Sequence, residues 1–128
     1  YVSDVAGKPF TVLLEHPTNT NQYIFTIPLQ NQSLCASSAN RRSWTDKKTG
    51  RLYSHIIDPA DTDRNTTALA FIVHDEAASA DALATTAAIL SDQPDQLKKV
   101  LGRLQAEYLL VDHNRVVAKS AHFPPLSE

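Results

Sequence analysis

Residues 77–90 read AASADALATTAAIL, and this stretch decides how the middle of the chain folds. Alanine is the best helix former, so a run dominated by alanine predicts a helix. Its small side chains also let a helix pack closely against a sheet. Within the run, Asp81 and Thr85 stand four residues apart, so their carboxylate and hydroxyl project from one helix face about one turn apart. Oxygen groups in this arrangement suit a hard cation such as Mg²⁺.

Around this helix the sequence predicts strands and a second helix. Apolar and alternating runs predict strands at residues 9–15, 22–30, 33–37, 42–45, 51–55, 68–74, 107–112 and 115–119. Asp92 and Pro94 signal the start of the second helix. An apolar stripe with helical spacing then runs through Leu97, Val100, Leu101 and Leu104. We therefore expect an α+β fold in which two helices pack on a largely antiparallel sheet.

Length and charge exclude several classes of protein. A chain of 128 residues is long enough for one domain, residues 1–128, with a single core. A net charge of -2 gives no basic field, so we expect no nucleic-acid partner. The only cysteine is Cys35, which excludes an internal disulfide. The start at Tyr1 suggests a processed product or a piece of a longer chain.

A second polar cluster occurs in Ser54-His55-Ile56-Ile57-Asp58-Pro59, at the end of the hairpin predicted for residues 42–55. Ordinary structural interpretations exist for its polar residues. A lone histidine at a strand end commonly has a hydrogen-bond partner. Asp-Pro sequences often begin turns, in which the Asp58 carboxylate accepts backbone N–H bonds. Asp81 is likewise compatible with a first-turn helix acid favoured by the helix dipole.

Several segments together resemble the C-terminal half of the ApbE family, the FAD:protein FMN transferases. The resemblance covers most of the chain and about half of a typical family member. It implies the C-terminal part of an ApbE-like fold, and a periplasmic protein or membrane-associated lipoprotein, although this chain carries no signal segment. The segments are Cys35-Ala36-Ser37-Ser38 with Arg41-Arg42, Gly50-Arg51-Leu52-Tyr53-Ser54-His55-Ile56-Ile57-Asp58-Pro59, Ala80-Asp81-Ala82-Leu83-Ala84-Thr85, Tyr108-Leu109-Leu110-Val111-Asp112, Arg115-Val116-Val117 and Ser120-Ala121-His122-Phe123.

The resemblance implies a role for each candidate site residue. Asp81 and Thr85 match the positions that bind Mg²⁺ beside the FAD pyrophosphate, where the metal neutralises charge during phosphoryl transfer. His55 and Asp81 are the implied catalytic residues, with His55 assisting deprotonation of the acceptor hydroxyl or orienting the phosphate. Ser37, His55 and Asp58 are the implied residues that bind the flavin cofactor.

The implied function is transfer of FMN from FAD to a threonine or serine hydroxyl of a redox flavoprotein, with Mg²⁺. Activity would require the missing N-terminal half of the same fold. The alternative is a non-catalytic interaction or scaffold module that has lost flavin chemistry. Ser38 in place of a family glycine favours it, as do Asp61 and Asp63, whose charge near a pyrophosphate would oppose binding unless they point away. Arg41 and Arg42 could reach a phosphate, but we favour solvated side chains.

Overall fold

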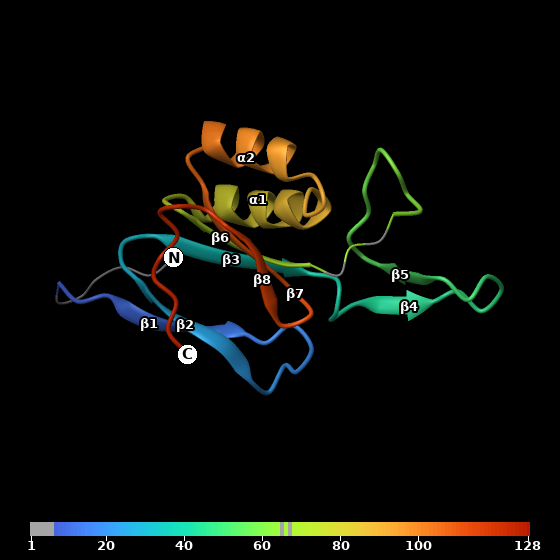
Figure 1. The fold of residues 1–128 in the computed structure, drawn as a ribbon, viewed down its shortest axis with the longest axis horizontal. Coiled ribbons are helices and arrows are strands. Elements are labelled where there is room, and N and C mark those ends of the chain that lie inside the picture. Colours follow the sequence, from blue (N-terminus) through green and yellow to red (C-terminus); the bar gives the residue numbers. More distant parts are fainter. Residues whose placement is uncertain (1–6, 65, 67) are drawn as a thin grey trace.

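The computed structural model describes residues 7–64, 66 and 68–128 of the chain (Figure 1). None of the described helices is long and apolar enough to cross a membrane. In chain order, the strands and helices of these residues are β1 (Phe10–Glu15), β2 (Tyr23–Leu29), β3 (Ser33–Ser38), β4 (Ser43–Thr45), β5 (Leu52–Ser54), β6 (Leu69–His74), α1 (Ala77–Ile89), α2 (Pro94–Arg103), β7 (Glu107–Asp112) and β8 (Arg115–Lys119).

A four-stranded antiparallel sheet forms the centre of the molecule, with strand order β3-β6-β7-β8. The two helices lie on one face of this sheet, and the antiparallel β1–β2 pair lies on the other (Figure 1). The expected α+β class, with antiparallel strands and two packed helices, is confirmed. The structure adds that the strands of the described residues are divided among three separate sheets.

Strands β6 and β7 are buried on both faces, which explains why they read as continuous apolar runs rather than alternating ones. Successive side chains of a strand point to opposite faces, so each strand contributes to two cores, and the expectation of a single core is wrong. The side chains that face the helices are Ala70, Ile72, Tyr108 and Leu110. The side chains in the core with β1 and β2 are Leu69, Phe71, Val73, Leu109 and Val111.

Both helices bury one face. The inner face of α1 is made chiefly of alanines, so its backbone comes close to β3 and β6. In α2, Leu97 and Leu101 are buried and Val100 is partly buried, as the apolar stripe predicts. The prediction that Leu104 belongs to this buried stripe is wrong, because Leu104 is 50% exposed. The helix ends at Arg103, so Leu104 belongs to the turn that leads away from it.

Strands β4 and β5 form a separate hairpin that extends from the body of the molecule (Figure 1). Trp44 and Tyr53 are directly opposite in its register, and their rings stack with centroids 6.3 Å apart. Gly50 closes the turn with a φ of +70°, a conformation that glycine adopts without steric cost. The predicted hairpin is therefore present, and it leads directly into His55.

We expect Leu101→Ala to lower the free energy of unfolding by about 2–5 kcal/mol, because it deletes a fully buried side chain and leaves a cavity. The matched control is Leu104→Ala, which removes the same atoms from a half-exposed position and should cost within about 0.5 kcal/mol. Urea denaturation followed by circular dichroism measures both values. Equal losses in the two variants would contradict this placement of α2.

Candidate functional site

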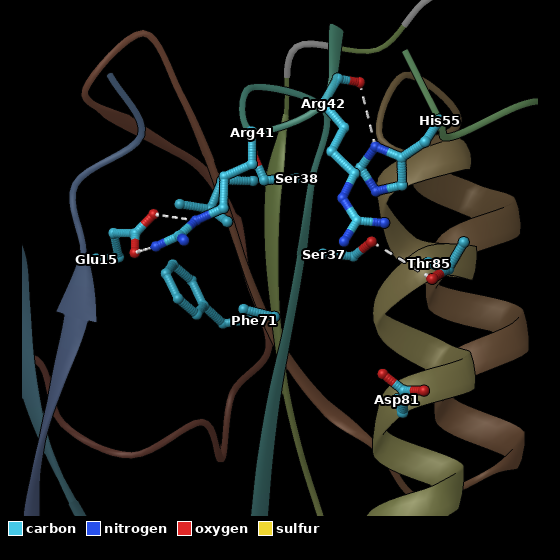
Figure 2. Close-up of a pocket in the computed structure, with 11 residues that line it drawn as sticks. Glu15, Ser37, Ser38, Arg41, Arg42, His55, Phe71, Asp81 and Thr85 are labelled. Atoms are coloured by element: carbon cyan, nitrogen blue, oxygen red, sulfur yellow. Dashed lines mark hydrogen bonds and ion pairs between the residues drawn. The ribbon is translucent and has the colours of Figure 1, made fainter. Parts of the chain in front are cut away.

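A cavity of about 460 Å³ opens beside α1, between the end of β1, strand β3 and the base of the β4–β5 hairpin (Figure 2). Its wall contains charged residues of both signs, uncharged polar residues and a few apolar residues. Four of the five sequence-predicted site residues lie in this wall. The lining residues are Glu15, Ala36, Ser37, Ser38, Arg41, Arg42, His55, Leu69, Phe71, Asp81 and Thr85.

One side of the cavity presents a carboxylate and two hydroxyls. Asp81 and Thr85 project from the exposed face of α1, and Asp81 points toward β3 in Figure 2. The Ser37 hydroxyl of β3 lies 3.4 Å from the Thr85 hydroxyl, within hydrogen-bond distance. The neighbouring Cys35 thiol also donates toward the Ala77 carbonyl, with 3.8 Å between sulfur and oxygen. These contacts hold β3 and α1 side by side, so the three oxygen groups face one space.

Two arginines supply the positive charge of the cavity wall. The guanidinium of Arg41 pairs with Glu15, through an Nε–Oε1 distance of 3.1 Å and a second contact from Nη2. The hydrogen bond to Glu15 raises the pKa of Arg41 further above its usual range. No ion pair involves Arg42 within the described part of the chain. Both arginines are solvent-exposed, as expected, yet both line the cavity, and Arg42 lies between Ser37 and His55 in Figure 2.

His55 occupies the cavity rim directly after β5. Its backbone N–H donates to the Arg42 carbonyl at 3.1 Å, and its ring Nδ1 lies 3.3 Å from the same oxygen. A carbonyl oxygen only accepts hydrogen bonds, so Nδ1 must carry the hydrogen for this contact to form. In the neutral ring, Nε2 is then the unprotonated nitrogen. The arrangement therefore leaves His55 with one nitrogen able to take a proton.

The fifth predicted residue, Asp58, does not line this cavity. It is only 8% exposed, and its Oδ1 accepts the Ala60 N–H at 2.9 Å. Its Oδ2 lies 3.3 Å from a guanidinium nitrogen of Arg64. The structure thus separates Asp58 from the other four residues and gives it the turn-forming contacts that Asp-Pro sequences commonly make.

The two acids that follow Asp58 also lie outside the cavity lining. Asp63 pairs with Arg51 at 3.4 Å, and the Asp61 carboxylate accepts the Asp63 N–H at 3.1 Å. Neither carboxylate adds negative charge to the wall of the cavity. The electrostatic objection to a bound pyrophosphate, raised by their presence in the sequence, therefore does not arise from this structure.

The donor set of the cavity fits Mg²⁺ as a partial site. Mg²⁺ prefers oxygen ligands and is commonly held by one or two carboxylates together with waters and phosphate oxygens. Asp81, Thr85 and Ser37 provide such oxygens. Across the described residues, no group of three or more His, Cys, Asp or Glu side chains could hold a metal. A bound magnesium ion would therefore take its other ligands from water, phosphate or another polypeptide segment.

Some lining residues were not predicted from the sequence. Glu15 lies at the end of β1, and only the packing of β1 and β2 beneath the central sheet brings it to Arg41. The position of Phe71 at the cavity could not be predicted, because in the sequence an apolar residue of a buried strand is indistinguishable from any other core residue. Ser38, which occupies the position of a family glycine, does line the cavity, and its hydroxyl donates to the Asn40 side chain at 2.6 Å.

Comparisons with known proteins identify a family and a similar fold. The profile of the ApbE family matches residues 2–110. The fold is similar to the crystal structure of the ApbE protein from Thermotoga maritima, with a TM-score of 0.76 and 21% sequence identity. That similarity covers 93% of this chain but only 38% of the Thermotoga protein, so the chain spans well under half of its length. A search of curated proteins found no match.

Because Asp81 lies near Cys35, removing the Asp81 charge should change the reactivity of the Cys35 thiol. Burial raises the pKa of this thiol, and the negative charge of Asp81 raises it further by opposing the thiolate. Asp81→Asn removes that charge, so the Cys35 pKa should fall and alkylation by iodoacetamide should begin at lower pH. Mass spectrometry of the alkylation rate against pH measures this cleanly, since Cys35 is the only cysteine.

The matched control for this experiment is Asp95→Asn, which removes an exposed acid from α2 rather than α1. It should leave the pH profile of Cys35 alkylation where it was. An unchanged profile in Asp81→Asn would contradict the position assigned to the Asp81 carboxylate.

Proposed function

We propose that this chain, which belongs to the ApbE family, forms the metal and pyrophosphate side of an FAD:protein FMN transferase. The observation that carries the proposal is the convergence on one cavity of five residues from separate elements, namely Asp81, Thr85, Ser37, His55 and Arg42. Because the chain spans 38% of the Thermotoga protein, the remaining walls of an FAD site would come from another part of the complete fold.

The proposed reaction is a phosphoryl-type transfer. The hydroxyl oxygen of a threonine or serine in an acceptor flavoprotein attacks the FMN phosphorus of FAD. The bond from this phosphorus to the bridging oxygen breaks, AMP leaves with that oxygen, and the hydroxyl proton passes to a base. A magnesium ion would supply charge neutralisation on the pyrophosphate as this bond breaks. The protein must then orient the phosphates and accept one proton.

Residues of the cavity suit these two tasks. Arg42, which lacks an acidic partner in the described part of the chain, would orient a phosphate through charge-assisted hydrogen bonds. His55 would accept the hydroxyl proton at Nε2 while its Nδ1–H stays on the Arg42 carbonyl. Asp81 would hold the cation, with Thr85 and Ser37 as neutral oxygen donors. The Glu15–Arg41 pair would form a nearly neutral floor beside them.

The second candidate function is a scaffold or interaction module that keeps the fold without flavin chemistry. One observation favours it, namely that the described cavity offers a single carboxylate on the side where a metal would bind. Asp61 and Asp63 support this second function less than the sequence suggested, because neither lines the cavity. Flavin binding and transfer assays distinguish the two functions.

We expect the isolated chain to bind FAD weakly or undetectably, because much of the ligand would remain in contact with water. Calorimetric titration with FAD and excess Mg²⁺ measures this. Submicromolar binding by the 128-residue chain alone would contradict the proposed dependence on the rest of the fold.

In a complete enzyme carrying these residues, Asp81→Asn should lower FMN transfer about 10²-fold or more, because it removes charge from the cation site while preserving size. His55→Ala should lower transfer by about 10²-fold or more through loss of the proton acceptor, with Mg²⁺-dependent FAD binding largely kept. The readout is in-gel fluorescence of flavin covalently attached to an acceptor protein.

Thermal melts of each variant serve as the stability control for this assay, and Asp95→Asn on α2 is the matched charge control. Both site variants should melt close to the parent protein, since Asp81 and His55 are exposed. Near-normal transfer by Asp81→Asn would exclude the proposed role of Asp81 in metal binding and would favour the scaffold function.

A further inference from the structure

Arg64 joins the segment that carries His55 to the helix that carries Asp81 and Thr85. Its guanidinium lies 3.3 Å from the Asp58 carboxylate and 3.1 Å from that of Asp92. It also donates to the backbone carbonyl of Ile89, the last residue of α1. Its side chain is only 25% exposed, so this is a partly buried junction rather than a solvated surface pair.

The contact with Ile89 completes the C-terminal end of α1. The last carbonyls of a helix lack partners within it, and a cation near them is stabilised by the helix dipole. The last turn of α1 contains no basic residue of its own. Arg64 therefore supplies, from a distant loop, the positive group that this helix end lacks.

The contact with Asp58 fixes the other side of the junction. Two successive turns fold the chain back on itself, with the Asp61 N–H donating to the Asp58 carbonyl at 3.2 Å and the Arg64 N–H donating to the Asp61 carbonyl at 3.0 Å. The Asp58 carboxylate is thereby buried and needs a positive partner nearby. Arg64 provides that charge, so loss of the guanidinium would leave a buried carboxylate without its counter-charge.

A second anchor, Ile56, lies between His55 and this junction. Ile56 is 5% exposed and belongs to the core formed by α1 and the central sheet. The Ser54 hydroxyl accepts the Ile56 N–H and donates to the Ile56 carbonyl, both at 3.2 Å. The segment that follows His55 is therefore attached to the body of the protein twice, first by the core side chain of Ile56 and then by the Arg64 junction at Asp58.

We propose that Arg64 is a positioning residue that holds the His55 segment in register with α1, and so sets where His55 stands relative to Asp81 and Thr85. Its effect on catalysis rests on the proposed transferase function, but the coupling between the segment and the helix does not. Lysine cannot replace it, because a single ammonium lacks the planar fork that contacts two carboxylates and a carbonyl together.

Hydrogen–deuterium exchange of the 128-residue chain, read by mass spectrometry, tests the coupling without any ligand. In Arg64→Gln and Arg64→Lys, amides of residues 55–63 and of the last turn of α1 should exchange about tenfold faster or more, while strands β6 and β7 keep their protection. Asp58→Asn combined with Arg64→Gln should still show fast exchange in the last turn of α1, because the double variant lacks the guanidinium that contacts the Ile89 carbonyl and Asp92. The matched control is Arg103→Gln, which removes an exposed arginine from the last turn of α2 and should leave the exchange of residues 55–63 unchanged.

Three results would overturn the proposal: unchanged exchange in Arg64→Gln, a uniform increase across the whole chain, or full recovery of protection in the double variant. In the complete enzyme, Arg64→Gln should lower the rate at saturating FAD at least about tenfold, with the KM for FAD within about threefold of the parent value. A local increase in exchange with no measurable transfer in the parent enzyme would contradict the transferase function alone. A local increase with an unchanged transfer rate would contradict the positioning role alone.

Discussion

Close packing of the alanine face of α1 against β3 and β6 is the constraint on which the site depends. Ala80, Ala84 and Ala87 are fully buried there, so the helix backbone comes near the sheet. A larger side chain at these positions would force the two layers apart or strain the core. This packing fixes how α1 lies beside β3, and so brings the Thr85 hydroxyl within 3.4 Å of the Ser37 hydroxyl.

The cavity wall combines charged side chains of both signs. Arg41 and Glu15 compensate each other, whereas Arg42 and Asp81 form no ion pair within the described part of the chain. In the proposed function, a ligand that carries both a cation and phosphates would compensate both of these charges at once. This expected complementarity, more than any single residue, motivates the proposal.

Local features were predictable from the sequence, and contacts between distant segments were not. Helix and strand positions followed from apolar spacing, and the common face of Asp81 and Thr85 followed from one helical turn. The sequence contained no comparable signal for the separation of the strands into three sheets, the Glu15–Arg41 pair or the Asp58–Arg64 junction, because each depends on packing between elements. Asp58 shows the limit most clearly, since the same Asp-Pro step suits both a turn and a cofactor contact.

The proposed function depends most directly on the binding of a divalent cation by Asp81 and Thr85 in this cavity. Titration of the ¹⁵N-labelled chain with Mn²⁺, followed by amide line broadening, locates such an ion because the paramagnetic metal relaxes nearby nuclei. We expect broadening of the amide signals of Asp81, Thr85, Ser37 and their neighbours, which excess Mg²⁺ relieves and Asp81→Asn abolishes. Broadening confined to Asp92 and Asp95, or none at all, would contradict the proposed function.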